Sequence, residues 1–247
     1  MTGRAAGADG RGMPPGAHQD THTHRDVSGG WLRPAVFGAM DGLITNVSLI
    51  AGVGGGGGAR HTLLLTGLAG LAAGAFSMAT GEYVSVSSQN DLVEAEVRKE
   101  RTELQNHPEA EQRELAEVFR RRGVDADLAE RVAGQMSANM EQALRVHVRE
   151  ELGVDHQDLP SPVTAATASL LTFATGALIP LLPYLLGFSS LAAALALSAV
   201  AAFAGGGLVS RFTELPFLRG AMRQLLLAAA ATALTYSIGH LVGVALN

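Results

Sequence analysis

Carboxylate and thioether side chains recur on one face of a helix predicted for residues 74–103. The stretch begins in an apolar segment, ends in a charged one and contains no Gly or Pro after Gly81, so we expect one uninterrupted helix. At about 100° per residue, the side chains that fall within roughly 40° of Met78 are Glu82, Ser85, Gln89, Glu96, Glu100 and Glu103. Because carboxylates and thioethers bind metal ions, this face is predicted to carry metal ligands along the helix.

Two acidic residues lie inside apolar segments. Asp41 follows Pro34 by seven residues, which corresponds to about 10 Å of helix. An ionisable group at that depth in a membrane costs at least ~2.5 kcal/mol if it faces lipid, so Asp41 is expected to face a partner or an aqueous path. Glu82 lies at a similar depth near the end of the next apolar segment, with Met78 one turn deeper. We predict that Asp41, Met78 and Glu82 line a path; a helix-packing hydrogen bond, an interfacial carboxylate and a packed thioether are the alternatives.

Further acidic residues occur in pairs at helical spacing. Glu100 with Glu103, and Glu111 with Glu114, are i,i+3 pairs. His147 with Glu151 is an i,i+4 pair that includes an imidazole. Each pair places two ligand groups on one helix face. Facing helices with such pairs can supply the six or so ligands that Fe²⁺ or Mn²⁺ accepts. A solvated acidic face is the alternative explanation. The predicted metal ligands are Glu96, Glu100, Glu103, Glu111, Glu114, His147 and Glu151.

Segments almost free of charge divide the 247-residue chain, and each contains about 20 residues or more. This length suits a hydrocarbon core of about 30 Å, whereas helices buried in a soluble protein would carry charged outer faces. We therefore predict an all-α, polytopic membrane protein with five transmembrane helices. The segments are residues 34–58, 62–81, 163–188, 191–209 and 224–246.

The expected organisation has four parts. Residues 1–30 form a polar tail without periodicity, expected to be disordered, in which histidines offer loose metal chelation. Transmembrane helices one and two occupy residues 31–88, and three to five occupy 162–247. Between them, residues 89–161 are predicted to form a cytosolic, helical, metal-binding insert. Its helices are expected to break at His107-Pro108, to begin after a cap at Asp125, to end at Gly153, and to cover 109–122, 126–137 and 138–152.

The basic residues predict an orientation. Of 18 Lys and Arg residues, four precede Pro34, ten lie within 89–161 and three lie between the last two apolar segments, whereas Arg60 alone lies between the first two. Basic residues favour the cytosolic side, so the N-terminus and the insert are expected in the cytosol and the C-terminus outside. A single lysine against 17 arginines favours a bacterial source, and hence a bacterial cytoplasmic membrane over a vacuolar one.

The composition also argues against several function classes. Cysteine is absent, which excludes disulfides and thiolate metal sites. No GxSxG or HExxH motif occurs, so no enzyme activity is expected, and no prosthetic group or nucleic-acid partner is indicated.

The motifs together resemble the vacuolar iron transporter family. They are Asp41-Gly42 in the first span, SMATGEYVSVSSQ at residues 77–89, an E-x-x-x-E-x-x-E helix after it, an ELG near the end of the insert, and three further spans. The likeness covers roughly residues 31–246. It implies a homodimer of five-span protomers that moves Fe²⁺ and related divalent ions out of the cytosol in exchange for protons. The path would lie between the protomers, lined by spans one and two.

The resemblance also implies roles for residues. Asp41, Met78 and Glu82 would line the path, and the cytosolic metal ligands would be Glu100, Glu103, Glu111, Glu114 and Glu151. The chain has His147-Val148 where plant-type members carry a Met-Met pair, and because imidazole titrates near neutrality we expect metal capture to depend on pH.

We therefore expect an exporter of Fe²⁺, with Mn²⁺ or other first-row divalent ions as further substrates, that works by proton antiport. Its partners are metal ions, protons, the lipid bilayer and a second copy of the chain. The alternative is a membrane-anchored metal buffer or sensor that does not transport, and this alternative predicts no role for Asp41.

Overall fold

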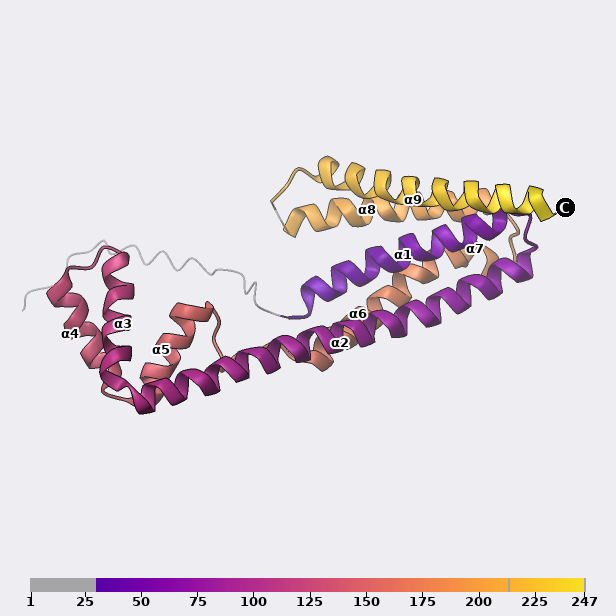
Figure 1. The fold of residues 1–247 in the computed structure, drawn as a ribbon. Helices are drawn as coiled ribbons and strands as arrows, with labels where there is room; N and C mark the ends of the chain where they lie inside the picture. Colours follow the sequence, from indigo (N-terminus) through magenta and orange to yellow (C-terminus); the bar gives the residue numbers. More distant parts are fainter. Residues whose placement is uncertain (1–29, 213, 247) are drawn as a thin grey trace, which may run out of the picture.

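The computed structural model describes residues 30–212 and 214–246, so the expectations for the N-terminal tail fall almost entirely outside the described residues. The described residues contain helices and no β-strand (Figure 1). In chain order the elements are α1 (Leu32–Gly55), α2 (Arg60–Asn106), α3 (Pro108–Arg121), α4 (Ala126–Ser137), α5 (Met140–Leu152), α6 (Pro162–Leu178), the 3₁₀-helix η1 (Ile179–Leu181), α7 (Leu182–Leu185), α8 (Leu191–Phe212) and α9 (Phe217–Leu246).

Within the described residues, five helical segments are long and apolar enough to cross a membrane, which confirms the predicted class of all-α, polytopic membrane protein. The last helix begins at Phe217, earlier than the charge-free segment that starts at residue 224. The difference arises because a helix can continue beyond the hydrocarbon core, and Arg219 and Arg223 lie in this added part. The spanning segments are Leu32–Gly55, Arg60–Asn106, Pro162–Leu185, Leu191–Arg211 and Phe217–Ala245.

Helix α1 lies at the centre of the membrane bundle and contacts α2, α6, α8 and α9. Its approach to α6 depends on small residues. A side chain at Gly38 or Gly42 would collide with the backbone of α6, and one at Gly176 would collide with the backbone of α1. Because lipid provides no hydrophobic driving force between helices, such close van der Waals packing stabilises the pair.

Pro180 and Pro183 interrupt the third span, so α6 gives way to η1 and α7. Proline lacks a backbone donor, and carbonyl groups of the preceding turn need other partners inside a membrane. Asn46 on α1 donates its side-chain amide to the carbonyl of Ala177 at 2.5 Å. Arg60, which lies between the first two spans, donates a hydrogen bond to the carbonyl of Tyr184 at 2.7 Å. This bond gives Arg60 a structural role.

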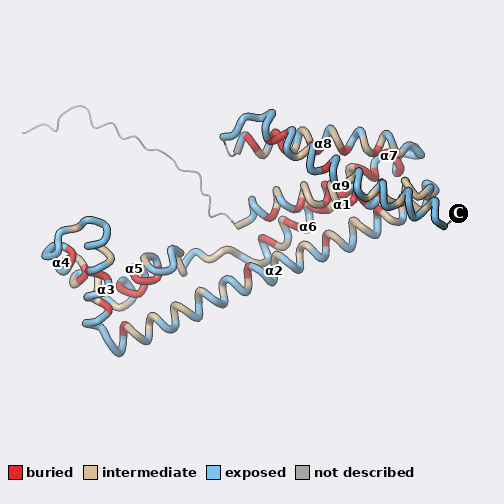
Figure 2. Tube along the Cα trace, turned by 45° about the horizontal axis from the view of Figure 1, so that its top comes forward, coloured by how far each residue is buried: buried red, intermediate tan, exposed pale blue. Residues whose placement is uncertain are grey.

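Helix α2 belongs to two packed regions. Its 47 residues extend about 70 Å, more than twice the hydrocarbon thickness of about 30 Å. The first part packs on α1 and α6, the last part packs on α5 and α3, and between Ala75 and Leu104 only Val86 is buried (Figure 2). The predicted continuity of this helix is confirmed, and it physically connects the bundle to α3–α5.

The last turns of α2 and helices α3–α5 enclose two small apolar cores, one formed by Leu104, Ala143, Leu144 and Val148, the other by Leu115, Ala116, Ala129 and Ala133. The predicted break at His107-Pro108, the cap at Asp125 and the end at Gly153 are confirmed. Asp125 accepts a hydrogen bond from the backbone of Asp127, and Gly153 ends α5 with φ of 69°. Helix α5 starts at Met140 and not at 138, because the backbone of Asn139 is extended and its side chain accepts a hydrogen bond from the backbone N–H of Gln142.

Candidate metal centre

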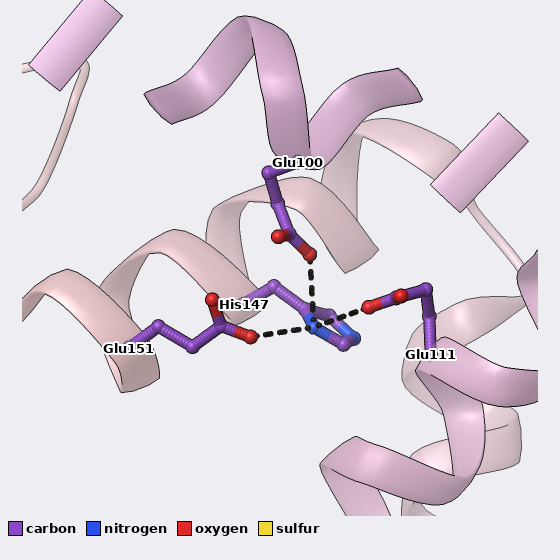
Figure 3. Close-up of side chains that lie close together, drawn as sticks. All are labelled: Glu100, Glu111, His147 and Glu151. Carbon is purple, nitrogen blue, oxygen red and sulfur yellow. Dashed lines mark ion pairs between the residues drawn. The ribbon is translucent and has the colours of Figure 1, made fainter. Parts of the chain in front are cut away.

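Three helices bring an imidazole and three carboxylates together at the junction of α2, α3 and α5. Glu100 comes from α2, Glu111 from α3, and His147 and Glu151 from successive turns of α5 (Figure 3). Each residue offers one ligand atom, and these atoms all lie within 4.8 Å of one another. That spacing suits several ligands around one divalent ion.

The distances are centred on Nδ1 of His147. This atom lies 3.1 Å from Oε1 of Glu100 and 3.6 Å from a carboxylate oxygen of both Glu111 and Glu151. The side chains of His147, Glu100 and Glu111 are 2%, 14% and 11% exposed, whereas Glu151 is 37% exposed. The group is therefore shielded on the helix side and reachable from solvent past Glu151.

The buried polar atoms of the group are incompletely paired. Oε1 of Glu100 has no hydrogen-bond partner among the described residues, so its 3.1 Å approach to Nδ1 is a close contact and not an aligned hydrogen bond. Nε2 of His147 is buried and also lacks a partner within the described residues. Buried groups without partners are costly, and a cation among the carboxylates would relieve part of that cost.

The electrostatics of the group favour bound positive charge. Burial by itself lowers the pKa of His147, but the nearby carboxylates, Glu100 first, outweigh burial and raise this pKa overall. Burial and the charge of Glu100 raise the pKa of Glu111, and burial followed by Glu100 and Glu114 raises the pKa of Glu151. Without a metal ion the group therefore holds protons to a higher pH than the same side chains would in water, and a divalent cation would compete with these protons.

Ion pairs and apolar packing fix α5 against its neighbours. Arg101 of α2 donates to both carboxylate oxygens of Glu141 at 2.5 and 3.3 Å, and Arg122 pairs with Glu150. The residue after His147, Val148, is buried in the core shared with Leu104. These contacts hold the imidazole in place by packing as well as by charge.

The other three predicted ligands occupy different positions. Glu96 lines a small cavity together with Glu100 and Glu151 and lies 3.8 Å from Lys99. Glu114 is exposed but close enough for its charge to raise the pKa of Glu111 and Glu151. Glu103 lies 3.9 Å from His107 and is outside the convergent group. Four of the predicted ligands thus converge, two lie at the margin, and Glu103 points elsewhere.

The three membrane residues of the predicted path are half-buried. Asp41 accepts a hydrogen bond from Thr45 at 3.4 Å, and Met78 packs against Phe173 and Ala177 of α6. Within residues 30–212 and 214–246, Asp41 and Glu82 belong to no group of three or more potential ligands. Among the described residues, the acidic side chains of the spans therefore do not form a group of three potential ligands.

Sequence reasoning missed Asn46. Its side chain is fully buried between α1 and α6, and Oδ1 has no partner among the described residues. The available signal was a lone amide side chain in an apolar span that precedes a proline-interrupted one, because a broken helix needs donors from elsewhere.

Comparison with known proteins identifies the family. The sequence model of the VIT family matches residues 32–240. The chain belongs to the VIT family. The match begins with α1 and ends inside α9, so the membrane bundle up to residue 240, the candidate metal centre and the residues of the predicted path lie within it.

Several relatives extend over most of the chain. It is 37% identical to "Vacuolar iron transporter" of Acanthamoeba castellanii, with 93% of this chain and 85% of that protein covered. It is 30% identical to "Vacuolar iron transporter 1" of Oryza sativa subsp. japonica, with 96% and 98% covered. "Vacuolar iron transporter 1" of Eucalyptus grandis is 27% identical, with 96% and 99% covered. The family resemblance inferred from the motifs is confirmed.

Proposed function

We propose that this VIT family protein exports Fe²⁺ from the cytosol across a membrane in exchange for protons. The observation that carries the proposal is the convergence of Glu100, Glu111, His147 and Glu151 at the far end of a helix that itself crosses the membrane. The iron transporters among its relatives support iron as the substrate. No enzymatic reaction is part of the proposal.

The donor set suits first-row divalent ions. Carboxylate oxygen is a hard ligand and imidazole a borderline one, a combination that Fe²⁺ and Mn²⁺ both accept. Mn²⁺ and other first-row ions are therefore proposed as further substrates. In this scheme the unit formed by the end of α2 with α3–α5 collects cytosolic metal, and α2 directs it toward Glu82, Met78 and Asp41.

The proposed path needs two protomers. Asp41 and Glu82 lack a third acidic or histidine ligand within the described chain, so we propose a homodimer in which the path lies between two copies. Basic residues gathered at the insert side support a cytosolic insert and an outward C-terminus, in a bacterial cytoplasmic membrane. Protons that enter from outside would compete for the same carboxylates and release the metal.

A second function deserves an explicit test. The four convergent ligands lie outside the bilayer, and this observation favours a membrane-anchored metal buffer or sensor without transport. The two functions differ in whether the membrane carboxylates matter.

The deciding experiment measures Fe²⁺ uptake into proteoliposomes, with and without a pH gradient. We expect uptake that a proton gradient drives, and we expect Asp41→Asn to abolish uptake while the metal-binding stoichiometry is unchanged. The matched control is Asp91→Asn, at an exposed position of α2, and this variant should take up Fe²⁺ normally. Metal binding without any uptake by the parent protein would favour the buffer, and normal uptake by a folded Asp41→Asn variant would exclude the proposed path.

A further inference from the structure

A cavity of about 290 Å³ opens between α1, α8 and α9, away from the metal centre. Two arginines line it, Arg33 from the first turn of α1 and Arg223 from the second turn of α9. The start of α1, the end of α8 and the start of α9 lie at one end of the bundle, the end from which α2 leaves toward α3–α5 (Figure 1).

The charge of these two arginines is uncompensated. Within the described residues, neither Arg33 nor Arg223 has an ion-pair or hydrogen-bond partner, and both are exposed. The first turns of α1 and α9 contain no acidic residue. Within the described residues of the first turn of α1, the last turn of α8, the first two turns of α9 and the connection between α8 and α9, there are four arginines and a single acidic residue, Glu214. The cavity therefore presents positive charge that the described residues leave free for an anion.

The remainder of the cavity wall is apolar. Val36, Phe37 and Met40 follow Arg33 along α1 toward the centre of the membrane, and the side chain of Phe37 is 56% exposed. A site with positive charge above and apolar side chains below matches a molecule with an anionic head and a hydrocarbon chain. Free phosphate would leave the apolar wall uncovered.

The depth of the cavity agrees with the headgroup layer. Helix α9 has 30 residues and so extends about 45 Å, roughly 15 Å more than the hydrocarbon core. Its first turns hold the arginines while its last turns are apolar, so the excess length lies at the arginine end. Trp31 occupies the N-cap position of α1 and is 54% exposed. Tryptophan side chains commonly anchor helices at the membrane interface.

We propose that Arg33 and Arg223 bind the phosphate of an anionic phospholipid from the leaflet next to the insert. A guanidinium forms paired, charge-assisted hydrogen bonds with phosphate oxygens, and two guanidiniums across one cavity hold the headgroup from both sides. Basic pockets between transmembrane helices recognise lipid headgroups in this way. The backbone N–H groups at the start of α1, where Trp31 provides no side-chain cap, add partial positive charge.

The test is lipid binding to the purified full-length protein in detergent, followed by native mass spectrometry. Phosphatidylglycerol and phosphatidylcholine are titrated separately, and the apparent Kd of the first bound lipid is compared. The variants are Arg33→Gln/Arg223→Gln and, as a matched control at the same end of the bundle, Arg211→Gln/Arg219→Gln. Because two headgroup contacts are lost, the first should bind phosphatidylglycerol about tenfold or more weakly, and the control should bind like the parent.

Three further measurements keep the result interpretable. Arg33→Lys/Arg223→Lys retains the charges and should recover most of the affinity, which separates lost charge from lost folding. Inorganic phosphate at millimolar concentration should not displace the lipid; displacement would assign the site to a free anion. Equal binding of both lipids, or equal affinity of the glutamine variant and its control, would overturn the proposal. A change of the glutamine variant from dimer to monomer with unchanged lipid binding would instead assign the cavity to a second copy of the chain.

Discussion

At position 147 we propose that a proton and a metal ion compete for the same imidazole nitrogen. The carboxylates of Glu100, Glu111 and Glu151 raise the pKa of His147 despite its burial, so protons compete for Nδ1 at a pH above its ordinary range. Metal affinity should therefore fall as pH falls through this raised pKa.

The stability of the metal-free protein has the opposite pH dependence. The raised pKa values of His147, Glu111 and Glu151 mean that the folded state binds more protons than the unfolded state. Their stabilising contribution is complete below the unfolded pKa values and is lost as pH rises through the folded ones. A bound metal ion would thus offset the loss of stability that deprotonation of the cluster causes.

The first prediction concerns His147→Met, which replaces a titrating ligand by a thioether. As pH falls through the raised pKa of His147, the affinity of the parent protein for Mn²⁺ should fall more steeply than that of the variant, because a thioether does not titrate and the carboxylates are common to both proteins. The measurement is calorimetric titration of both proteins at several pH values. His107→Met, at an exposed histidine, is the control and should follow the parent. Parallel curves for His147→Met and the parent would show that His147 is not a ligand.

The second prediction compares two glutamates of the first turn of α3. Glu111 is buried in the candidate metal centre, whereas Glu109 is exposed. Glu111→Gln should weaken Mn²⁺ binding by at least about tenfold, because it removes a charged ligand. The same change should stabilise the metal-free protein at neutral pH, because ionised Glu111 is disfavoured by burial and by Glu100. Glu109→Gln should alter neither quantity, and equal effects of both variants would make the acidic cluster an ordinary solvated face.

At the scale of helices, close contacts between backbones determine how the helices of the membrane bundle pack. Gly42 lies against the carbonyl of Phe173 on α6, whereas Gly81 on α2 has open space around it. The third prediction is that Gly42→Ala destabilises the protein by about 1–3 kcal/mol, because a methyl group forces α1 and α6 apart. Gly81→Ala should be neutral or stabilising by up to about 1 kcal/mol, because alanine favours a helix. Thermal unfolding in detergent measures both, and equal midpoints would contradict the tight α1–α6 contact.

Local sequence signals predicted individual helices well. Asp125 begins α4 and Gly153 ends α5 where capping preferences place them. These features depend only on neighbouring residues, so a single sequence contains the necessary information.

Relations between helices were less accessible. The i,i+3 spacing predicted that Glu100 and Glu103 act together, but only Glu100 meets His147, while Glu103 faces His107. Two residues on one helix face diverge once a second helix crosses at a single point, and the crossing angle is set by packing that spacing does not encode. Asn46 illustrates the same limit, because its partner Ala177 is 131 residues away.

At the scale of the whole molecule, α2 is the physical link between the candidate metal centre and the membrane bundle. Its exposed middle section has few contacts with other helices, and Asn90 there donates a hydrogen bond to the carbonyl of Pro160 at 3.0 Å. This bond ties the helix to the segment that returns from α5 to α6. A change at the candidate metal centre can therefore reach the bundle through two connections, the helix itself and the tied return segment.

The division between metal centre and membrane path predicts different kinetic effects. Glu100→Gln/Glu111→Gln weakens metal capture, so the Fe²⁺ concentration for half-maximal flux should rise at least about tenfold while the maximal flux is retained. Asp41→Asn should lower the maximal flux, because saturating metal cannot replace a group on the path. Initial flux into proteoliposomes over a range of Fe²⁺ concentrations measures both parameters. Glu109→Gln/Glu130→Gln removes the same charge at exposed positions and is the control. A lower maximal flux of the first variant at saturating metal would mean that the carboxylates at the end of α2 take part in translocation itself.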